Sequence, residues 1–201
     1  GLGRREPAEE LSPAGALALV PQPALRLRIP HVVRDLLTDL GAQAFECGGD
    51  GVCGLCSVAA ALHDGDAGPT PGELLNLLRR QMQPLRDAVA AAQARGGDAP
   101  HLLLFPLTDR GWREFARDMD ASLEPGHMAA LAELLGVRIA VFDGSLGRDQ
   151  QPVVAEPILG LHPQPPQHST DDPAGVRVLL LRQPRVAEGH WVLLRPHGSA
   201  P

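Results

Sequence analysis

A glycine-rich loop that leads directly into an apolar run is the feature that most constrains how this chain folds. The loop is Gly48-Gly49-Asp50-Gly51, and the run after it extends from Cys53 to Leu62. Glycines followed by a run without proline predict a turn and then a helix that Cys53 begins. A thiolate is stabilised at a helix N-terminus, where unpaired N–H groups and the helix dipole favour negative charge. The position of Cys53 therefore indicates a reactive thiol.

A histidine at the start of a late apolar run is the second candidate for the same chemistry. His190 follows a turn around Gly189 and precedes Trp191-Val192-Leu193-Leu194. If folding brings His190 close to Cys53, its imidazole can take the thiol proton and return it. The two residues together indicate a cysteine hydrolase.

Helical patterns fill the middle of the chain, and strand-like patterns are concentrated near its end, which predicts an α+β fold. The expected helices cover 31–40, 53–62, 71–95 with a break at Pro84, 109–123 and 128–135. The expected strands cover 137–141, 153–154, 176–181 and 190–194. We expect Asp109 to cap its helix, Glu124-Pro125-Gly126 to end that helix, and Gly136 to end the next one.

The chain is long enough for one domain with extended ends. Residues 1–29 are rich in proline, alanine and acidic residues, which predicts a disordered or linker tail without a signal peptide. The domain itself is expected over 30–197. Within it, the segment from about 144 to 174 is rich in proline, glutamine and aspartate and is expected to form a long surface excursion.

Composition argues against two classes of partner. The net charge is −6 and the basic residues are scattered, so nucleic acid is not expected as a partner. Aromatic residues make up 3% of the chain and tyrosine is absent, which leaves few rings for stacking on bases. No stretch approaches the roughly 20 uninterrupted apolar residues of a membrane span, so no membrane contact is expected.

Three segments of the chain resemble one protease family. Asp50-Gly51-Val52-Cys53 is similar to the Asp-Gly-Asn-Cys signature of the ovarian-tumour (OTU) family of papain-like cysteine proteases, which cleave ubiquitin from its conjugates. The middle block 112–143, in which Gly126-His127 opens an Ala-Leu-Ala helix, and the final His190-Trp191 pair also resemble that family. The resemblance covers about 30–195. It implies an OTU-like papain-type fold with a small mixed or antiparallel sheet packed between helices.

The resemblance also implies a catalytic set. Cys53, activated by His190, is expected to attack the carbonyl at the C-terminus of ubiquitin or a ubiquitin-like protein. Asp50 matches the aspartate of the motif and is our first candidate for a third catalytic residue. The position two residues after the histidine, which often has that role in the family, is Val192. Four other acidic residues stay open as the third member: Asp143, Asp171, Asp172 and Glu188.

The same resemblance implies how the substrate is held. The backbone around Gly51 and Val52, together with the N–H of Cys53, is expected to stabilise the oxyanion of the tetrahedral intermediate. Trp191 is expected to shield the histidine and to cover a narrow channel for the Gly-Gly tail of ubiquitin. No cofactor and no metal are expected for this reaction.

Departures from the family pattern keep other classes of protein open. Val52 stands where the family has asparagine, and with Val192 it leaves room for a catalytically weak or inactive ubiquitin-binding module. Cys53-Gly54-Leu55-Cys56 is also a Cys-x-x-Cys, the spacing of a redox pair or of half a zinc site. Zinc requires four ligands, and Cys47 and His63 could complete the set only with unusual spacing.

The composition adds a hypothesis about origin. All 18 basic residues are arginine, tyrosine is absent and asparagine occurs once, a set that GC-rich coding explains together. A lysine-free chain also offers no side-chain acceptor for ubiquitin, and both explanations can hold. Together with the resemblance, this composition suggests a bacterial effector or toxin module. Such a protein acts in the cytoplasm, or is secreted or translocated into the cytosol of a host cell.

Overall fold

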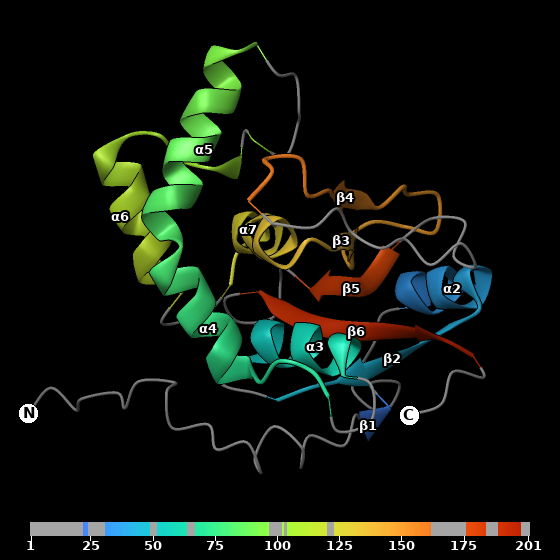
Figure 1. The fold of residues 1–201 in the computed structure, drawn as a ribbon. Helices are drawn as coiled ribbons and strands as arrows, with labels where there is room; N and C mark the ends of the chain where they lie inside the picture. The colour runs from blue at the N-terminus through green and yellow to red at the C-terminus, as the bar shows by residue number, and fades with distance from the viewer. Residues whose placement is uncertain are drawn as a thin grey trace, which may run out of the picture.

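The computed structural model describes residues 22–23, 31–48, 52–63, 67–96, 102, 104–119, 123–161, 176–183 and 189–197. These residues form a mixed α+β fold in which helices cover a six-stranded sheet (Figure 1). The predicted α+β class is confirmed. Among the described residues, no helix is long and apolar enough to cross a bilayer.

The strands of the sheet lie in the order β1-β2-β6-β5-β3-β4. Their bounds are β1 Gln22–Pro23, β2 Ala42–Glu46, β3 Arg138–Asp143, β4 Val153–Ala155, β5 Val176–Gln183 and β6 His190–Pro196. Neighbouring strands are antiparallel except β3 and β5, which run parallel. The four predicted strands are confirmed as β3, β4, β5 and β6, whereas β1 and β2 were not predicted.

The helices are α2 His31–Leu40, α3 Cys53–Leu62, α4 Pro71–Arg80, α5 Met82–Ala94, α6 Asp109–Asp118 and α7 Pro125–Leu135. The predicted bounds of α2 and α3 are confirmed. Gly41 and Gly136 follow α2 and α7 with φ of 59° and 65°. Glycine adopts this left-handed conformation without a steric penalty, so both glycines end their helices, as predicted for Gly136.

Several helix boundaries differ from the prediction. α6 ends at Asp118 and α7 begins at Pro125, whereas the predicted helices covered 109–123 and 128–135. The break between α4 and α5 falls at Gln81, so Pro84 lies in the first turn of α5, where a missing N–H removes no helical hydrogen bond. The cap of α6 is Thr108 and not Asp109, because the Thr108 hydroxyl accepts the N–H of Gly111 at 3.0 Å.

The segment predicted to end α6 instead begins α7. Glu124 is the N-cap of α7 and forms a capping box with His127. The Nδ1 atom of His127 accepts the N–H of Glu124 at 2.8 Å, and its Nε2 lies 2.7 Å from the carbonyl oxygen of Phe115. Since Nδ1 accepts, Nε2 carries the proton and donates it. His127 is fully buried and thus holds the start of α7 against α6.

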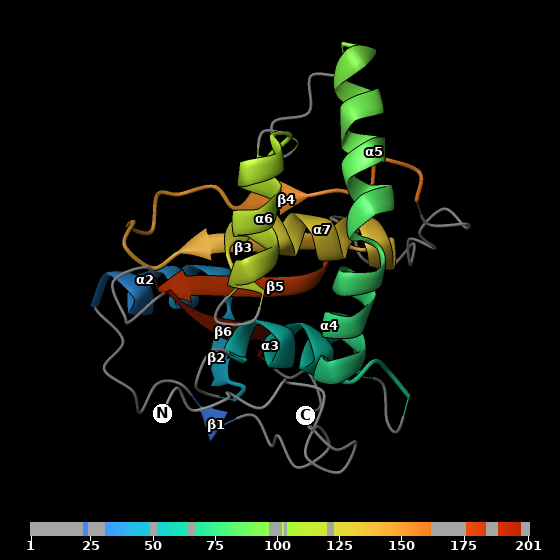
Figure 2. The same ribbon diagram turned by 90° about the vertical axis from the view of Figure 1, so that its left-hand side faces the viewer.

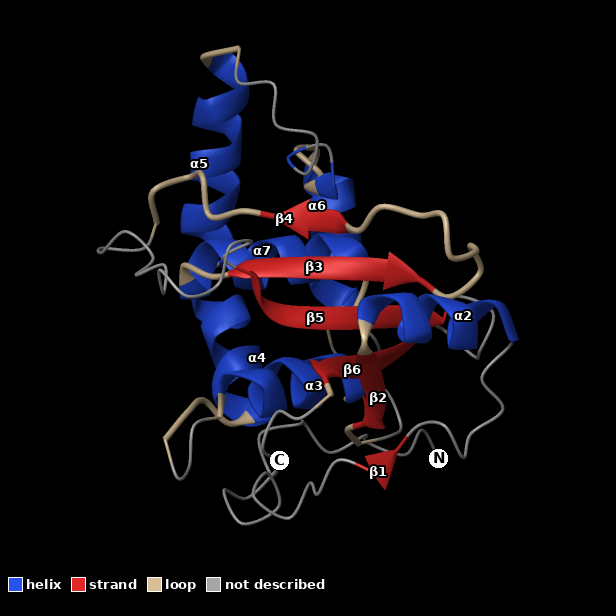
Figure 3. Cartoon of the chain, turned by 90° about the vertical axis from the view of Figure 1, so that its right-hand side faces the viewer, coloured by secondary structure: helices blue, strands red, loops and turns tan. Residues whose placement is uncertain are grey.

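Two apolar clusters lie on opposite faces of the sheet. On β6, Val192 and Leu194 pack with α2, while Trp191 and Leu193 pack with the cluster that contains α3 to α7. This alternation follows from the two-residue period of a strand. Figure 2 shows α4, α5 and α6 in front of the strands, and Figure 3 shows α2 on the opposite side.

The predicted tail and excursion are described only in part. Within 1–29 the structure describes Gln22 and Pro23, which pair with the end of β2, and the remainder lies outside the described residues. Within 144–174 it describes the residues up to 161, including β4 at the sheet edge. The predicted surface excursion beyond that point lies outside the described residues.

Candidate active site

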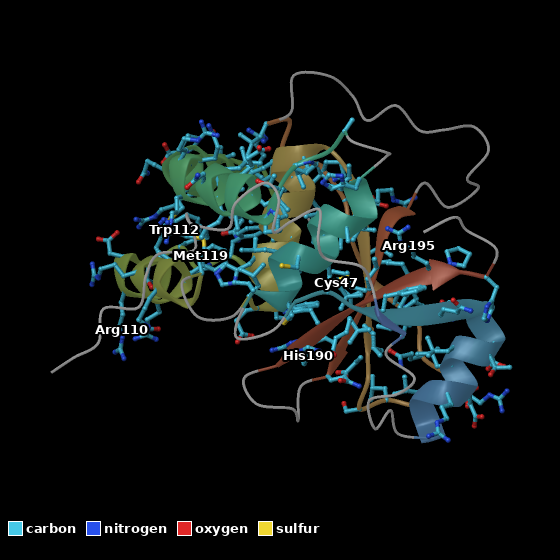
Figure 4. The ribbon with its side chains drawn as sticks, turned by 90° about the horizontal axis from the view of Figure 1, so that it is seen from below. Cys47, Arg110, Trp112, Met119, His190 and Arg195 are labelled. Atoms are coloured by element: carbon cyan, nitrogen blue, oxygen red, sulfur yellow. The ribbon has the colours of Figure 1, made fainter. Side chains whose placement is uncertain are left out.

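The start of helix α3 meets the start of strand β6, and this brings Cys53 and His190 together. The Cys53 side chain is hydrogen-bonded to the His190 side chain. The N–H of Trp191, the next residue along β6, lies 3.5 Å from the Cys53 sulfur and donates to it. Figure 4 shows His190 at the beginning of β6. The two predicted residues therefore form one site.

The site contains a third side chain that the sequence did not indicate. Glu46, the last residue of β2, accepts a hydrogen bond through Oε1 from Nε2 of His190. Because Nε2 faces Glu46, Nδ1 is the ring nitrogen that remains for the Cys53 thiol. Cys53, His190 and Glu46 thus form a continuous hydrogen-bonded line of thiol, imidazole and carboxylate.

The register of β2 and β6 explains how Glu46 reaches His190. Phe45 is paired with Leu193, so Glu46 lies opposite Val192 and diagonal to His190. Residues that are two positions apart along a strand share a face, and diagonal partners lie within reach of long side chains. Both side chains are largely buried, at 29% exposed for Glu46 and 18% for His190. Such burial strengthens the charge interaction between them.

The five acidic residues considered for this role have different outcomes. Asp50, Asp171, Asp172 and Glu188 lie outside the described residues, as does Gly51. Asp143 is described and is not the orienting residue. Its Oδ1 accepts the N–H and the hydroxyl of Ser145 at 2.8 and 2.6 Å, which stabilises the turn after β3. Moreover, β5 separates β3 from the strand that carries His190.

The surroundings of Cys53 favour its thiolate form. Burial alone would raise the pKa of the Cys53 thiol. The hydrogen bond from His190 and the N–H groups of Trp191 and Gly54 outweigh burial, so the pKa is lowered from the usual 9.0. The pKa of His190 is raised from 6.5, chiefly by its hydrogen bond to Cys53, with a smaller contribution from Glu46. The pair therefore favours thiolate and imidazolium.

The other two cysteines have the opposite character. Cys47 and Cys56 are free thiols and are each only 1% exposed. Burial is the largest influence on both and raises the pKa of Cys47 to about 11 and that of Cys56 to about 12. Neither is ionised near neutral pH, so Cys53 is the thiol best suited among the three cysteines to act as a nucleophile.

Trp191 has a different role from the one we expected. Its indole ring is fully buried, and Nε1 donates to the carbonyl oxygen of Leu123 at 2.8 Å. The guanidinium of Arg182 lies 5.7 Å from the ring centroid. The ring therefore packs in the core beneath the site and does not cover a substrate channel. Only the backbone N–H of Trp191 faces the nucleophile.

Val52 is the half-buried N-cap of α3. It makes no side-chain cap, and its carbonyl oxygen accepts the N–H of Cys56 at 2.9 Å. The first N–H groups of a helix have no partners within the helix. Because valine carries no acceptor, the Val52 side chain does not compete for these N–H groups, and they remain able to bind an oxyanion beside Cys53.

The cysteines do not form a recognisable metal centre. Among the described residues, no group of three His, Cys, Asp or Glu side chains is disposed to hold a metal ion. His63 follows the last residue of α3, so it lies about 15 Å along the helix from Cys53. This separation keeps His63 from joining Cys53 and Cys56 around one ion.

Comparison of the chain with models of known protein families and with curated proteins finds no match. The residues themselves define what the site can do. A thiolate at a helix N-terminus, paired with an imidazole that a carboxylate orients, can attack an electrophilic carbon and return a proton to a leaving group. These are the requirements of acyl transfer through a thioester.

Proposed function

We propose that the chain is a cysteine hydrolase that cleaves peptide or isopeptide bonds at the C-terminus of ubiquitin or a ubiquitin-like protein. The single observation that carries the proposal is the hydrogen-bonded line from Cys53 through His190 to Glu46 at the N-terminus of α3. The choice of ubiquitin depends on the resemblance of 50–53, 112–143 and 190–191 to the OTU family. Assignment of the α+β fold to the OTU-like papain type belongs to the same proposal.

The first half of the reaction forms a thioester. The Cys53 thiolate attacks the carbonyl carbon of the terminal glycine of ubiquitin, which makes a C–S bond and moves the carbonyl electrons onto oxygen. The N–H groups at the start of α3 stabilise this oxyanion, an effect of about 2.7–4 kcal/mol per donor in hydrolases. His190 then transfers a proton to the amine nitrogen of the substrate lysine. The C–N bond breaks and the lysine amine leaves.

The second half releases ubiquitin. Neutral His190 takes a proton from water as the water oxygen attacks the thioester carbonyl. The C–S bond then breaks, the Cys53 thiolate is restored and ubiquitin leaves with a free carboxyl group. Glu46 holds the imidazole in one orientation and stabilises its protonated form.

Reaction with ubiquitin that carries a C-terminal electrophile tests the proposal. The native chain is expected to form a covalent adduct of one ubiquitin, and Cys53→Ala is expected to form none. Cys56→Ala serves as the matched control, since it removes a neighbouring buried thiol and is expected to keep the adduct. An adduct that depends on Cys56 contradicts the assignment of the nucleophile. Binding of ubiquitin without any adduct supports the alternative of an inactive ubiquitin-binding module.

We also propose that the protein is a bacterial effector that acts in the cytosol of a host cell. This rests on the lysine-free, GC-rich composition and on the resemblance to a ubiquitin-directed family. Assignment of the gene to a eukaryotic genome would contradict this part of the proposal and would leave the hydrolase part unaffected.

A further inference from the structure

Two cysteines beside Cys53 have no part in the proposed hydrolysis. Cys56 lies one turn further along α3, and Cys47 follows the last residue of β2. Figure 4 shows Cys47 beside α3. A Cβ atom placed on Gly48 would lie 2.9 Å from the Cys56 sulfur, so the backbone that follows Cys47 packs directly on Cys56. The three sulfurs are close enough to affect one another's ionisation.

Cys53 and Cys56 are the two members of this group that lie on one helix, one turn apart. They occupy the first turn of one helix with a spacing of three residues, so their side chains share a face and their Cβ atoms lie about 5–6 Å apart. A disulfide needs a Cβ separation of about 3.5–4.5 Å, so this terminal turn must tighten for the bond to form. Cys47 follows strand β2 and approaches from outside the helix.

The two thiols also differ in the manner that a redox pair requires. Cys53 tends to the thiolate, the form that reacts with an oxidant. Burial keeps Cys56 protonated, with a pKa of about 12, and a protonated thiol reacts far more slowly with an oxidant than a thiolate does. Cys53 is therefore suited to be oxidised, and Cys56 is suited to attack the oxidised sulfur of Cys53.

We propose that Cys53 and Cys56 form a reversible redox pair, in which a peroxide oxidises Cys53 and Cys56 then closes a disulfide that blocks the nucleophile. This inference adds a modification site to the protein and does not depend on ubiquitin as the substrate. A hydrolase with such a pair is switched off under oxidising conditions and is protected from irreversible damage.

Hydrogen peroxide oxidises the pair in two steps. The Cys53 thiolate attacks one peroxide oxygen, the O–O bond breaks, hydroxide leaves and Cys53 becomes a sulfenic acid. The Cys56 sulfur attacks the Cys53 sulfur, the S–O bond breaks, and the hydroxide leaves as water with the Cys56 proton. A dithiol reductant then returns both cysteines to thiols and is itself oxidised to a disulfide.

Digestion with a protease that cleaves before aspartate tests the pairing directly. Asp39, Asp50 and Asp64 place Cys47 in the peptide 39–49, and Cys53 and Cys56 together in the peptide 50–63. After treatment of the folded protein with equimolar hydrogen peroxide, we expect the peptide 50–63 to be two hydrogens lighter, resistant to alkylation and not linked to another peptide. Linkage of the two peptides would show that Cys47 is the partner and would overturn the proposal.

Serine variants of the two buried cysteines provide matched controls. Cys47→Ser is expected to keep the disulfide. Under excess hydrogen peroxide, which supplies the two equivalents that a sulfinic acid requires, Cys56→Ser is expected to accumulate sulfinic acid at Cys53, so that a dithiol restores at most about a tenth of its reactivity toward iodoacetamide. Full recovery in Cys56→Ser would overturn the proposal. The peptide masses and alkylation rates can be measured without any hydrolysis. A chain that forms the disulfide but does not react with ubiquitin therefore contradicts only the proposed function.

Discussion

Glu46 and His190 are 144 residues apart in the chain and are hydrogen-bonded to each other across the antiparallel strands β2 and β6. Glu46 is the last residue of β2, and His190 is the first residue of β6. Because a sheet fixes both backbones, the imidazole is oriented by the core of the protein and not by a loop alone. The same sheet holds Trp191, whose N–H reaches the sulfur of Cys53.

The first prediction concerns Glu46. Glu46→Gln preserves the size of the side chain but removes the charge that favours the His190 imidazolium. We expect kcat for a fluorogenic ubiquitin substrate to fall by about 10²- to 10⁴-fold, while the fold is retained. Glu114→Gln is the control, because Glu114 is exposed and pairs with Arg110 on the surface of α6. Native kcat in Glu46→Gln would exclude Glu46 from the site.

The second prediction concerns pH. The lowered pKa of Cys53 and the raised pKa of His190 bracket the range in which thiolate and imidazolium coexist. We therefore expect a bell-shaped profile of kcat/KM, with its acid limb set by Cys53 and its alkaline limb by His190. Since Glu46 raises the pKa of His190, Glu46→Gln should move the alkaline limb to lower pH. An alkaline limb that moves to higher pH in Glu46→Gln would contradict the assignment of this limb to His190.

The reactivity of the thiol provides a third prediction that needs no substrate. His190→Ala removes the largest of the influences that lower the pKa of Cys53 and leaves the effect of burial in place. The pKa should therefore rise, and alkylation of Cys53 by iodoacetamide at neutral pH should slow by about tenfold or more. The rate should recover as the pH approaches the new pKa. An unchanged rate at neutral pH would show that His190 does not activate Cys53.

Local patterns were sufficient to predict α3 and the place of Cys53 at its first residue. The apolar run from Cys53 to Leu62 follows glycines and has no interruption, so the helix and its start are visible in one segment. The same holds for the alternating strand β3 and for the glycine that ends α7. In each case the determining interactions lie within a few residues of one another.

Glu46 was missed because its role depends on a long-range pairing. β2 is built from Ala42, Gln43, Ala44, Phe45 and Glu46, and alanine has a low strand propensity. A weak signal was present, since Ala42 and Ala44 alternate with polar Gln43 between two glycines. That alternation does not reveal the partner strand, which lies about 150 residues away. For the same reason, the sequence could not show that the Trp191 ring is buried.

Arg182 is the subject of the fourth prediction. Its Nη2 donates to Glu124 at 2.8 Å, and its guanidinium lies over the Trp191 ring and against Gly189, which has φ of 81° directly before His190. Arg182→Met keeps the apolar stem but loses these polar contacts. We expect a loss of about 1–3 kcal/mol in the free energy of unfolding, measured with urea. Arg148→Met, which breaks an exposed ion pair with Asp39, should lose less than Arg182→Met does, because solvent screens that pair.

The last prediction concerns the space between Cys53 and Trp191. A Cβ atom on Gly54 would lie 2.9 Å from the Met128 methyl group, 3.1 Å from Trp191 Cδ1 and 3.2 Å from Leu123 Cδ1. Alanine favours a helix over glycine by about 1 kcal/mol, but overpacking of a core costs about 1–3 kcal/mol. Since three side chains crowd this position, we expect Gly54→Ala to lower the unfolding free energy.

The same substitution should also affect the nucleophile. In the native chain, the contact between the Trp191 N–H and the Cys53 sulfur lowers the pKa of Cys53. Moving Trp191 away from Gly54 lengthens this contact, so the pKa of Cys53 should rise. Alkylation of Cys53 at neutral pH should therefore slow in Gly54→Ala. Gly147→Ala is the matched control, because Gly147 is exposed and no atom lies within 4 Å of its added Cβ. Equal stability and equal alkylation rates in the two variants would show that the packing beneath Cys53 does not set its reactivity.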